Sequence, residues 1–283
     1  MRILTRLQIG PVLLVSFVCK VAAAGDVVDS MAQAHADDKP VATPVATAAP
    51  ARAIRAASVQ YASIDGEPVT GYLAAPEQGA DGASAIIVIH EWWGLNDNIR
   101  GVTERLAGEG YRALAVDLYR GELAEDPKTA MKLSRGLQQQ AEQANDNLRQ
   151  AYEFLAAQDA PRIGVIGWCL GGRWSLRTAL LLPDQVDATV IYYGSLVTDR
   201  DQLATLQMPI LGNFGEADPL IPLDDIAAFE QILTELGKDV DVKVYPDAQH
   251  AFSNPSGTAY NPEAAQDAWG RTTSFFARHL QAN

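Results

Sequence analysis

Residues 164–172, GVIGWCLGG, limit the possible folds of this chain more than any other stretch. An apolar run at residues 163–167 leads to Cys169, and Gly167 and Gly171 stand two positions on either side of it. A side chain at the tip of a sharp strand-to-helix turn requires small residues at these positions, because larger ones would clash across the turn. The stretch therefore predicts a strand, a tight turn and a helix, with Cys169 raised above the end of a sheet.

Strand-like and helix-like patterns alternate on both sides of this turn. The runs at residues 59–64 and 69–76 flank Asp65-Gly66 and are typical of an antiparallel hairpin. Further strands are expected at residues 84–90, 111–119, 163–167, 188–194, 208–215 and 240–246, and helices at 97–108, 126–157, 172–182, 222–236 and 262–280. This alternation predicts an α/β fold, a mostly parallel sheet with helices on both faces, in a single domain over residues 58–283.

The N-terminus is typical of an export signal. Arg2 and Arg6 precede a short apolar core at residues 11–18, and small residues at 21–24 match a cleavage site. The core is shorter than the roughly 20 residues that a membrane-spanning helix needs. We therefore predict a cleaved signal peptide over residues 1–24, no stable membrane insertion after cleavage, and a secreted or periplasmic location.

Composition narrows the range of partners. Residues 25–57 are rich in Ala and Pro and predict a flexible tether. The chain has 35 acidic and 22 basic side chains, a net charge of −13, which repels nucleic-acid phosphates and anionic lipid. A small anionic substrate in a local cationic pocket is still compatible with that charge. The sequence has no H-E-x-x-H, Walker or dinucleotide-binding glycine pattern, so we expect no metal and no organic cofactor.

Cys169 is the only thiol that would remain after signal cleavage, since Cys19 lies within the predicted signal peptide. An internal disulfide is then impossible. A single cysteine can be a small buried hydrophobe or a nucleophile. Its place between an apolar strand and a helix favours the nucleophile.

Elimination among the four histidines identifies a candidate base. Where a nucleophile stands on such a turn, the acid and then the histidine follow it along the chain. His35 lies in the predicted tether, His279 in the last turn of the final helix, and His90 precedes Cys169. Only His250, in the loop DAQHAF, fits this order.

The candidate acid follows the strand at residues 208–215, in the segment GEADPLIP. Its function would be to accept the imidazole N–H and stabilise the imidazolium. Asp218 is favoured and Glu216 is the alternative, whereas Asp224 and Asp225 are typical of helix caps.

A set of further motifs occurs in order along residues 58–280. These motifs are GYLAAP, IVIHEWWGLN, VDLYRG, GVIGWCLGG, YYG, FGEADPLIP and DAQHAFSNP. With them the chain resembles the dienelactone hydrolase family of α/β-hydrolases. The resemblance implies an α/β-hydrolase fold in which the sheet carries a catalytic triad.

The resemblance also implies roles for individual residues. Cys169 would be the nucleophile, Asp218 the acid and His250 the base. Glu91 would hold the resting thiol neutral, and then move and take its proton when substrate binds. The physical basis is that a carboxylate near sulfur opposes thiolate formation, while a helix N-terminus favours it.

Backbone N–H groups of Leu170 and Trp92 would form the oxyanion hole by the same resemblance. Trp93 is a candidate for the pocket wall, together with Trp92. The sequence departs from the family where an arginine would hold a substrate carboxylate, because Asn254 stands there. For a second such arginine, Arg120 and Arg135 are near the expected place without aligning to it.

These observations predict a cysteine-dependent hydrolase of lactones or activated carboxylic esters, acting through a thioester on a small-molecule substrate. One alternative keeps the triad and acts as a general carboxylesterase or thioesterase. Another is a non-catalytic protein that binds a small molecule in the same pocket.

Overall fold

A computed structural model of the chain describes residues 36, 40, 48–255 and 257–281. The predicted signal peptide, residues 1–24, lies outside these residues, as does most of the predicted tether, residues 25–57. Among the residues described, no helix combines the length and the apolar character that a membrane span requires.

Eight strands form one sheet in the order β1-β2-β4-β3-β5-β6-β7-β8. The strands are β1 (Ile54–Ile64), β2 (Glu67–Pro76), β3 (Ala85–Ile89), β4 (Arg112–Val116), β5 (Ile163–Trp168), β6 (Ala188–Tyr192), β7 (Ile210–Gly215) and β8 (Val240–Tyr245). The hairpin β1–β2 and the pair β2–β4 are antiparallel, and all other neighbours are parallel. The predicted mostly parallel sheet is confirmed.

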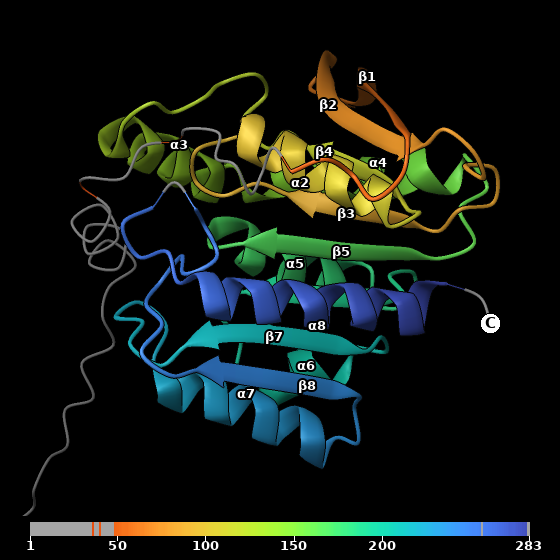
Figure 1. Cartoon of the computed structure of the whole chain (residues 1–283). Coiled ribbons are helices and arrows are strands. Elements are labelled where there is room, and N and C mark those ends of the chain that lie inside the picture. Colours follow the sequence, from red (N-terminus) through yellow and green to blue (C-terminus); the bar gives the residue numbers. More distant parts are fainter. Residues whose placement is uncertain (1–35, 37–39, 41–47, 256, 282–283) are drawn as a thin grey trace, which may run out of the picture.

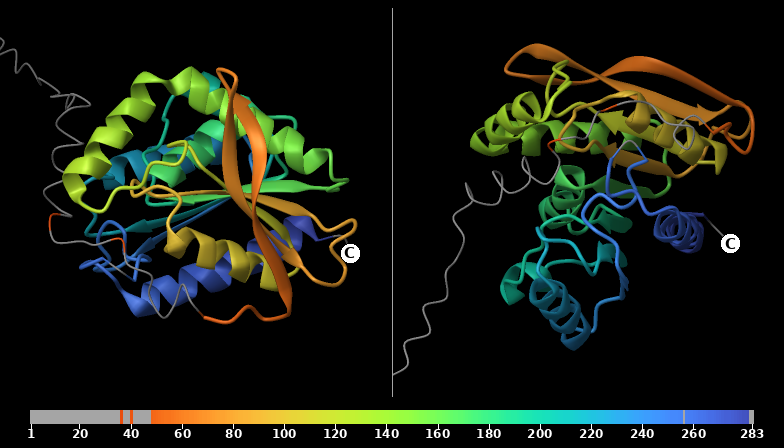
Figure 2. Two further views of the ribbon diagram at one scale, coloured as in Figure 1. Left: turned by 90° about the horizontal axis from the view of Figure 1, so that it is seen from above. Right: turned by 60° about the vertical axis from the view of Figure 1, so that its left-hand side comes forward.

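Helices cover both faces of this sheet. They are α2 (Asp97–Gly108), α3 (Pro127–Gln139), α4 (Ala141–Ala156), α5 (Leu170–Leu181), α6 (Arg200–Ala204), α7 (Leu223–Glu235) and α8 (Pro262–Leu280). Helices α2 and α8 lie on one face, and α4 and α5 lie on the other (Figures 1 and 2). The predicted α/β-hydrolase architecture is therefore confirmed.

The central strands are buried along their whole length. Every residue of β3, β5 and β6 is buried, as expected for strands with helices on both faces. In the register of β3 and β5, Ile89 lies opposite Gly167, so the two strands end at the same level. The residues that follow them, including Glu91 and Cys169, therefore emerge side by side.

Strand β1 begins at Ile54, before the domain boundary expected at residue 58. Ile54 pairs with Pro76 through the backbone, while most side chains of residues 54–58 point to solvent. A strand held by backbone pairing alone has no apolar alternation, and therefore no signal in the side-chain pattern.

Two helical features also differ from expectation. The helical stretch predicted at residues 126–157 is divided at Gln140, whose φ and ψ of −106° and 36° are not helical. The short helix α6 occupies a segment with no predicted helix. Asp199 caps α6 by accepting a hydrogen bond from the backbone N–H of Gln202 at 2.9 Å.

The predicted strand–turn–helix around Cys169 is present, and it is tightly packed. A Cβ atom on Gly167 would lie 2.2 Å from the carbonyl oxygen of Gly171, and one on Gly171 would lie 2.3 Å from that of Ile89. Cys169 itself has a φ of 55° and a ψ of −114°, a conformation that non-glycine residues rarely adopt. The two glycines are therefore required by contacts with backbone atoms, which cannot rotate away.

We expect Gly171→Ala to lower the free energy of unfolding by about 3 kcal/mol, because its methyl group would press on the end of β3. The matched control is Gly136→Ala in α3, where a Cβ atom would meet nothing within 4 Å. That change should be neutral or stabilise by up to about 1 kcal/mol. Urea denaturation followed by circular dichroism measures both values, and equal values for the two variants would contradict this account of the turn.

Candidate active site

Four side chains of the predicted site follow neighbouring parts of the sheet, each after the carboxyl end of a strand. They are Glu91 after β3, Cys169 after β5, Asp218 after β7 and His250 after β8. Parallel strands present their carboxyl ends at one edge, which is where α/β folds place binding sites. All four side chains are buried.

Cys169 is held by hydrogen bonds of the turn. Its backbone N–H donates to the carbonyl of Tyr192 at 3.0 Å, and the backbone N–H of Leu170 donates to its sulfur. Burial raises the pKa of the Cys169 thiol, as do the charges of Glu91 and, more weakly, Asp218, while the Leu170 N–H opposes the rise. Burial and the negative charges of Glu91 and Asp218 therefore all favour the neutral thiol.

His250 and Asp218 form a buried pair. The Nδ1 atom of His250 lies 2.8 Å from Oδ2 of Asp218. The other carboxylate oxygen, Oδ1, accepts hydrogen bonds from the backbone N–H groups of Leu220 at 2.7 Å and Ile221 at 3.2 Å. Glu216, the alternative acid, is exposed and accepts from the backbone N–H of Asp247 at 3.3 Å.

Backbone contacts join the loops that carry this pair. The N–H of Ala217 donates to the carbonyl of Ala248 at 2.9 Å, and a Cβ on Gly215 would lie 2.2 Å from that same oxygen. Tyr193 packs against this pair, with its ring centroid 5.2 Å from that of His250. Burial raises the pKa of Tyr193, and the charges of Glu91 and Cys169 raise it further.

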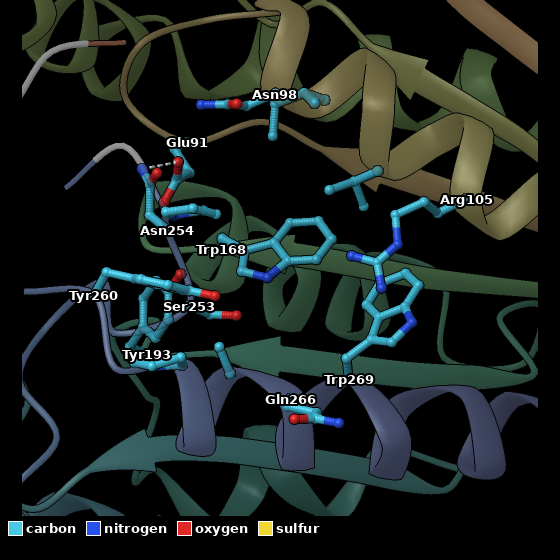
Figure 3. A pocket seen from close by; sticks show the side chains of 15 residues that line it. Glu91, Asn98, Arg105, Trp168, Tyr193, Ser253, Asn254, Tyr260, Gln266 and Trp269 are labelled. Atoms are coloured by element: carbon cyan, nitrogen blue, oxygen red, sulfur yellow. Dashed lines mark hydrogen bonds between the residues drawn. The ribbon is translucent and has the colours of Figure 1, made fainter. Parts of the chain in front are cut away.

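Asn254 holds Glu91 in place. Its amide Nδ2 donates to Oε2 of Glu91 at 2.7 Å, and Figure 3 shows this bond at one end of a pocket. The two side chains are 7% and 6% exposed, so the hydrogen bond forms where water competes little. Asn254, expected to contact substrate, thus also positions a predicted catalytic carboxylate.

His90 has a structural role in the same region. Its Nε2 accepts from the backbone N–H of Leu118 at 3.2 Å, so its Nδ1 carries the proton and donates to the carbonyl of Glu91 at 2.5 Å. Burial lowers the pKa of His90. A neutral His90 therefore ties the segment that carries Glu91 to the end of β4.

The pocket beside these residues has a volume of about 310 Å³. Its lining residues include Glu91, Trp168, Tyr193, Asn254, Tyr260, Arg105 and Trp269. Figure 3 shows Glu91 and Asn254 at one end, Trp168 in the middle, and Arg105 with Trp269 at the other end. Its size suits a small organic molecule.

Sequence reasoning missed Arg105 and Trp269 as pocket residues. Arg105 lies in the last turn of α2, where a cation is explained by the helix dipole alone. Trp269 lies in α8, where an aromatic residue is typical of packing. No sequence signal distinguishes these two pocket residues from a helix-capping cation and a packing aromatic residue, because the pocket forms only when α8 packs near α2.

Two predicted substrate-binding residues lie elsewhere. The Nη1 atom of Arg120 lies 3.8 Å from Oδ2 of Asp65, and Arg120 lines a different cavity together with Gly121. Trp93 is 2% exposed and packs against Trp92, with 5.0 Å between the two ring centroids. Among the described residues that line the pocket, Trp93 does not occur. A role of these two residues in substrate binding stays a prediction. The carbonyl of Trp92 accepts from the hydroxyl of Tyr119 at 3.1 Å, which orients the loop after β3.

Across the residues that the structure describes, no group of three or more His, Cys, Asp or Glu side chains is arranged to hold a metal ion. The chemically reactive side chains of the site are a thiol, an imidazole and two carboxylates, those of Cys169, His250, Asp218 and Glu91. This set is typical of acyl transfer by a cysteine nucleophile.

The fold and these residues define the class as an α/β-hydrolase. The sequence profile described as "Dienelactone hydrolase family" matches residues 69–280. A relative from Saccharolobus solfataricus, named "Putative carboxymethylenebutenolidase", is 33% identical over 252 residues, which cover 76% of this chain and 95% of the relative. The chain therefore belongs to the dienelactone hydrolase family, and the predicted ester-bond hydrolase class is confirmed at that level.

Solved structures agree with this assignment. The crystal structure titled "Putative Dienelactone Hydrolase" from Klebsiella pneumoniae is 31% identical, with a TM-score of 0.72, covering 81% of this chain and 100% of that one. The dienelactone hydrolase structure from Anabaena variabilis, 21% identical, shares the fold with a TM-score of 0.62, covering 81% of this chain and 99% of that one.

We expect Glu91→Gln to make the resting thiol more reactive. The variant keeps the size of the side chain and removes its negative charge, so the pKa of Cys169 should fall and more thiolate should be present at pH 8. Alkylation of Cys169 by iodoacetamide, followed by mass spectrometry of the Cys169 peptide, should accelerate roughly tenfold.

The control for this measurement is Glu153→Gln, an exposed glutamate on α4. Its alkylation rate should match that of the parent. A Glu91→Gln protein that reacts no faster than the parent would show that Glu91 does not hold the thiol neutral.

Proposed function

We propose that this chain is a cysteine-dependent hydrolase of lactones or activated carboxylic esters, acting through Cys169, His250 and Asp218. The observation that carries the proposal is the buried His250–Asp218 hydrogen bond of 2.8 Å, at the sheet edge where Cys169 stands on its strained turn. A histidine oriented by a carboxylate is what a thiol needs to exchange protons during acyl transfer.

The cycle begins with a neutral thiol held beside Glu91. When substrate enters the pocket, Glu91 leaves Asn254 and takes the thiol proton, and the thiolate attacks the carbonyl carbon. Electrons of the C=O bond move to the oxygen, and the N–H groups of Leu170 and Trp92 stabilise the resulting oxyanion.

The adduct then collapses to a thioester. The C–O bond of the ester breaks, and the alkoxide or enolate departs with the bond electrons and takes the proton that Glu91 received from the thiol, which leaves Glu91 as a carboxylate again. His250 next removes a proton from water, which attacks the thioester carbonyl, and the C–S bond breaks to release the acid and the thiolate. The thiolate then takes the proton held by His250, which restores the neutral thiol and the neutral imidazole. A thiolate is itself a good leaving group, so esters with good leaving groups are favoured substrates.

A general carboxylesterase or thioesterase is the second candidate. Asn254, an uncharged amide, stands beside Glu91 at the polar end of the pocket. A substrate therefore needs no charged group next to its scissile bond to fit this end of the pocket, and simple esters meet this condition.

We expect trapping of the acyl-enzyme to identify the nucleophile. Rapid acid quench during turnover of an enol-lactone or an aryl ester should leave an acyl adduct on the Cys169 peptide, detected by its mass. Cys169→Ala should have no measurable turnover, and an adduct on another residue would refute the proposed chemistry.

The acid can be tested by a matched pair of variants. Asp218→Asn should lower kcat by about 10³- to 10⁴-fold, because the amide cannot stabilise a charged imidazole. Glu216→Gln should stay within about twofold of the parent, because its side chain is exposed. The reverse order of effects, measured by steady-state kinetics, would assign the acid to Glu216.

We also propose that the protein is exported and that residues 1–24 are removed. The support is the sequence alone: basic residues, a short apolar core and small residues before Gly25. Expression in a Gram-negative bacterium followed by fractionation should yield a periplasmic protein whose N-terminal residue is Gly25. An intact N-terminus in the cytoplasmic fraction would contradict export.

A further inference from the structure

Strand β8 is an outer strand of the sheet. It pairs with β7 along one edge, and within the described part of the chain no strand pairs with its other edge (Figure 1). The unpaired edge of a strand presents backbone N–H and C=O groups that can form hydrogen bonds with a further strand. The residues at this edge are VDVKV, 240–244, in which three valines alternate with one acidic and one basic residue.

The hydrogen bonds to β7 show which backbone groups of β8 point outward. The N–H of Ile210 donates to the carbonyl of Asp239 at 2.9 Å, and the N–H of Glu216 donates to the carbonyl of Tyr245 at 2.9 Å. Backbone groups of a strand alternate in direction from one residue to the next. Odd-numbered residues of β8 therefore direct their N–H and C=O groups to β7, and the three valines direct theirs outward.

The side chains of β8 alternate between the two faces of the sheet. Asp241 and Lys243 lie on the face that carries α8. Asp241 accepts a hydrogen bond from Arg271 at 2.8 Å, and Lys243 donates one to Asp267 at 2.7 Å. The three valines lie on the opposite face, partly buried against the core. The side chains of Asp241 and Lys243 are 58% and 38% exposed, so both are accessible to a neighbouring strand.

We propose that β8 pairs with β8 of a second copy of this chain, antiparallel about a two-fold axis at Val242. The outward N–H and C=O groups of Val242 would exchange both hydrogen bonds with those of the same residue in the second copy. Asp241 of each copy would then lie opposite Lys243 of the other. Pairs at such positions, between the hydrogen-bonded ones, have the most closely spaced side chains of an antiparallel ladder. Two ion pairs therefore form across the axis.

The two charges select this register over its symmetric neighbours. An axis at Asp241 would place that aspartate opposite its own copy, and an axis at Lys243 would place lysine opposite lysine. Like charges directly opposite each other destabilise a strand pair, whereas opposite charges stabilise it. Charged residues on an edge strand can also serve to prevent pairing. A protective role does not require both signs of charge, placed symmetrically about an outward-facing valine.

The resulting dimer would have one continuous sheet, made of the eight strands of each copy. Because the axis reverses the direction of β8, the carboxyl edges of the two sheets would face opposite ways. The pocket beside Glu91 is lined by residues outside β8, so each copy would keep its own pocket. The inference is therefore independent of the proposed function, and dimer formation requires no change in hydrolysis.

Sedimentation equilibrium of the purified protein at micromolar concentrations should give twice the mass of one chain. Asp241→Lys and Lys243→Asp should each raise the dissociation constant of the dimer about tenfold or more, because each places like charges opposite each other twice. Each variant also breaks an ion pair with α8. The decisive measurement is therefore an equimolar mixture of the two variants. Mixing should restore the dimer, because the lysines of one copy then face the aspartates of the other.

The matched control is Glu142→Lys on α4. The side chain of Glu142 is 85% exposed and lies 3.8 Å from Arg177, so this variant also reverses an acidic charge and breaks an ion pair with an arginine. Helix α4 packs against β1, at the other end of the sheet. The variant should keep the dissociation constant of the parent. An equal loss of the dimer in Glu142→Lys and Asp241→Lys would overturn the inference.

Val242→Pro tests the backbone pairing directly. Proline removes the central outward N–H and leaves the hydrogen bonds to β7 in place, as is typical of proline on an edge strand. The variant should be monomeric, with the circular dichroism spectrum of the parent. If Val242→Pro does not fold, the mixture of the two charge variants decides.

Three results would overturn the inference. The first is a parent protein that stays monomeric at all concentrations, which would show that the charges of β8 only protect the edge. The second is a dimer that persists in Val242→Pro and in both charge variants, which would assign the interface to another surface. The third is a pair of monomeric charge variants whose mixture stays monomeric, because a defect within one chain cannot be repaired by mixing.

Discussion

The close approach of the turn after β5 to the end of β3 determines both the fold and the site. Gly171 packs so tightly against the carbonyl oxygen of Ile89 that no side chain fits between them. This contact joins the two central strands where they end, and it places Cys169 beside the segment that carries Glu91. The strained backbone of Cys169 is maintained because the surrounding buried strands leave no alternative path.

The electrostatics of the site follow from this packing. Burial and the charges of Glu91 and Asp218 raise the pKa of the Cys169 thiol, while the N–H of Leu170 at the start of α5 opposes that rise. Asn254 keeps Glu91 in its resting position, and backbone N–H groups keep Asp218 oriented toward His250. In the proposed mechanism this arrangement is the resting state, and a neutral thiol is less easily oxidised than a thiolate.

The pocket adds a second layer of organisation, because its two ends come from different parts of the chain. The polar end is built from the loops after β3 and β8, and the far end from α2 and α8. A molecule that fills this pocket would therefore contact both the loops at the sheet edge and the helices α2 and α8, which cover one face of the sheet. In the proposed function the hydrolytic groups lie at the sheet edge, whereas part of the pocket that would contact the substrate comes from helices α2 and α8.

The sequence by itself determined the alternation of strands and helices, the tight turn, and the order Cys169, Asp218, His250, because these depend on local periodicity, on glycine spacing and on position along the chain. It could not reveal the start of β1, which is held by backbone pairing with exposed side chains. Nor could it place Arg105 in the pocket, exclude Arg120 from it, or pair Asn254 with Glu91. These outcomes depend on contacts between segments far apart in sequence, and only the packing of α2 and α8 near the sheet edge decides them.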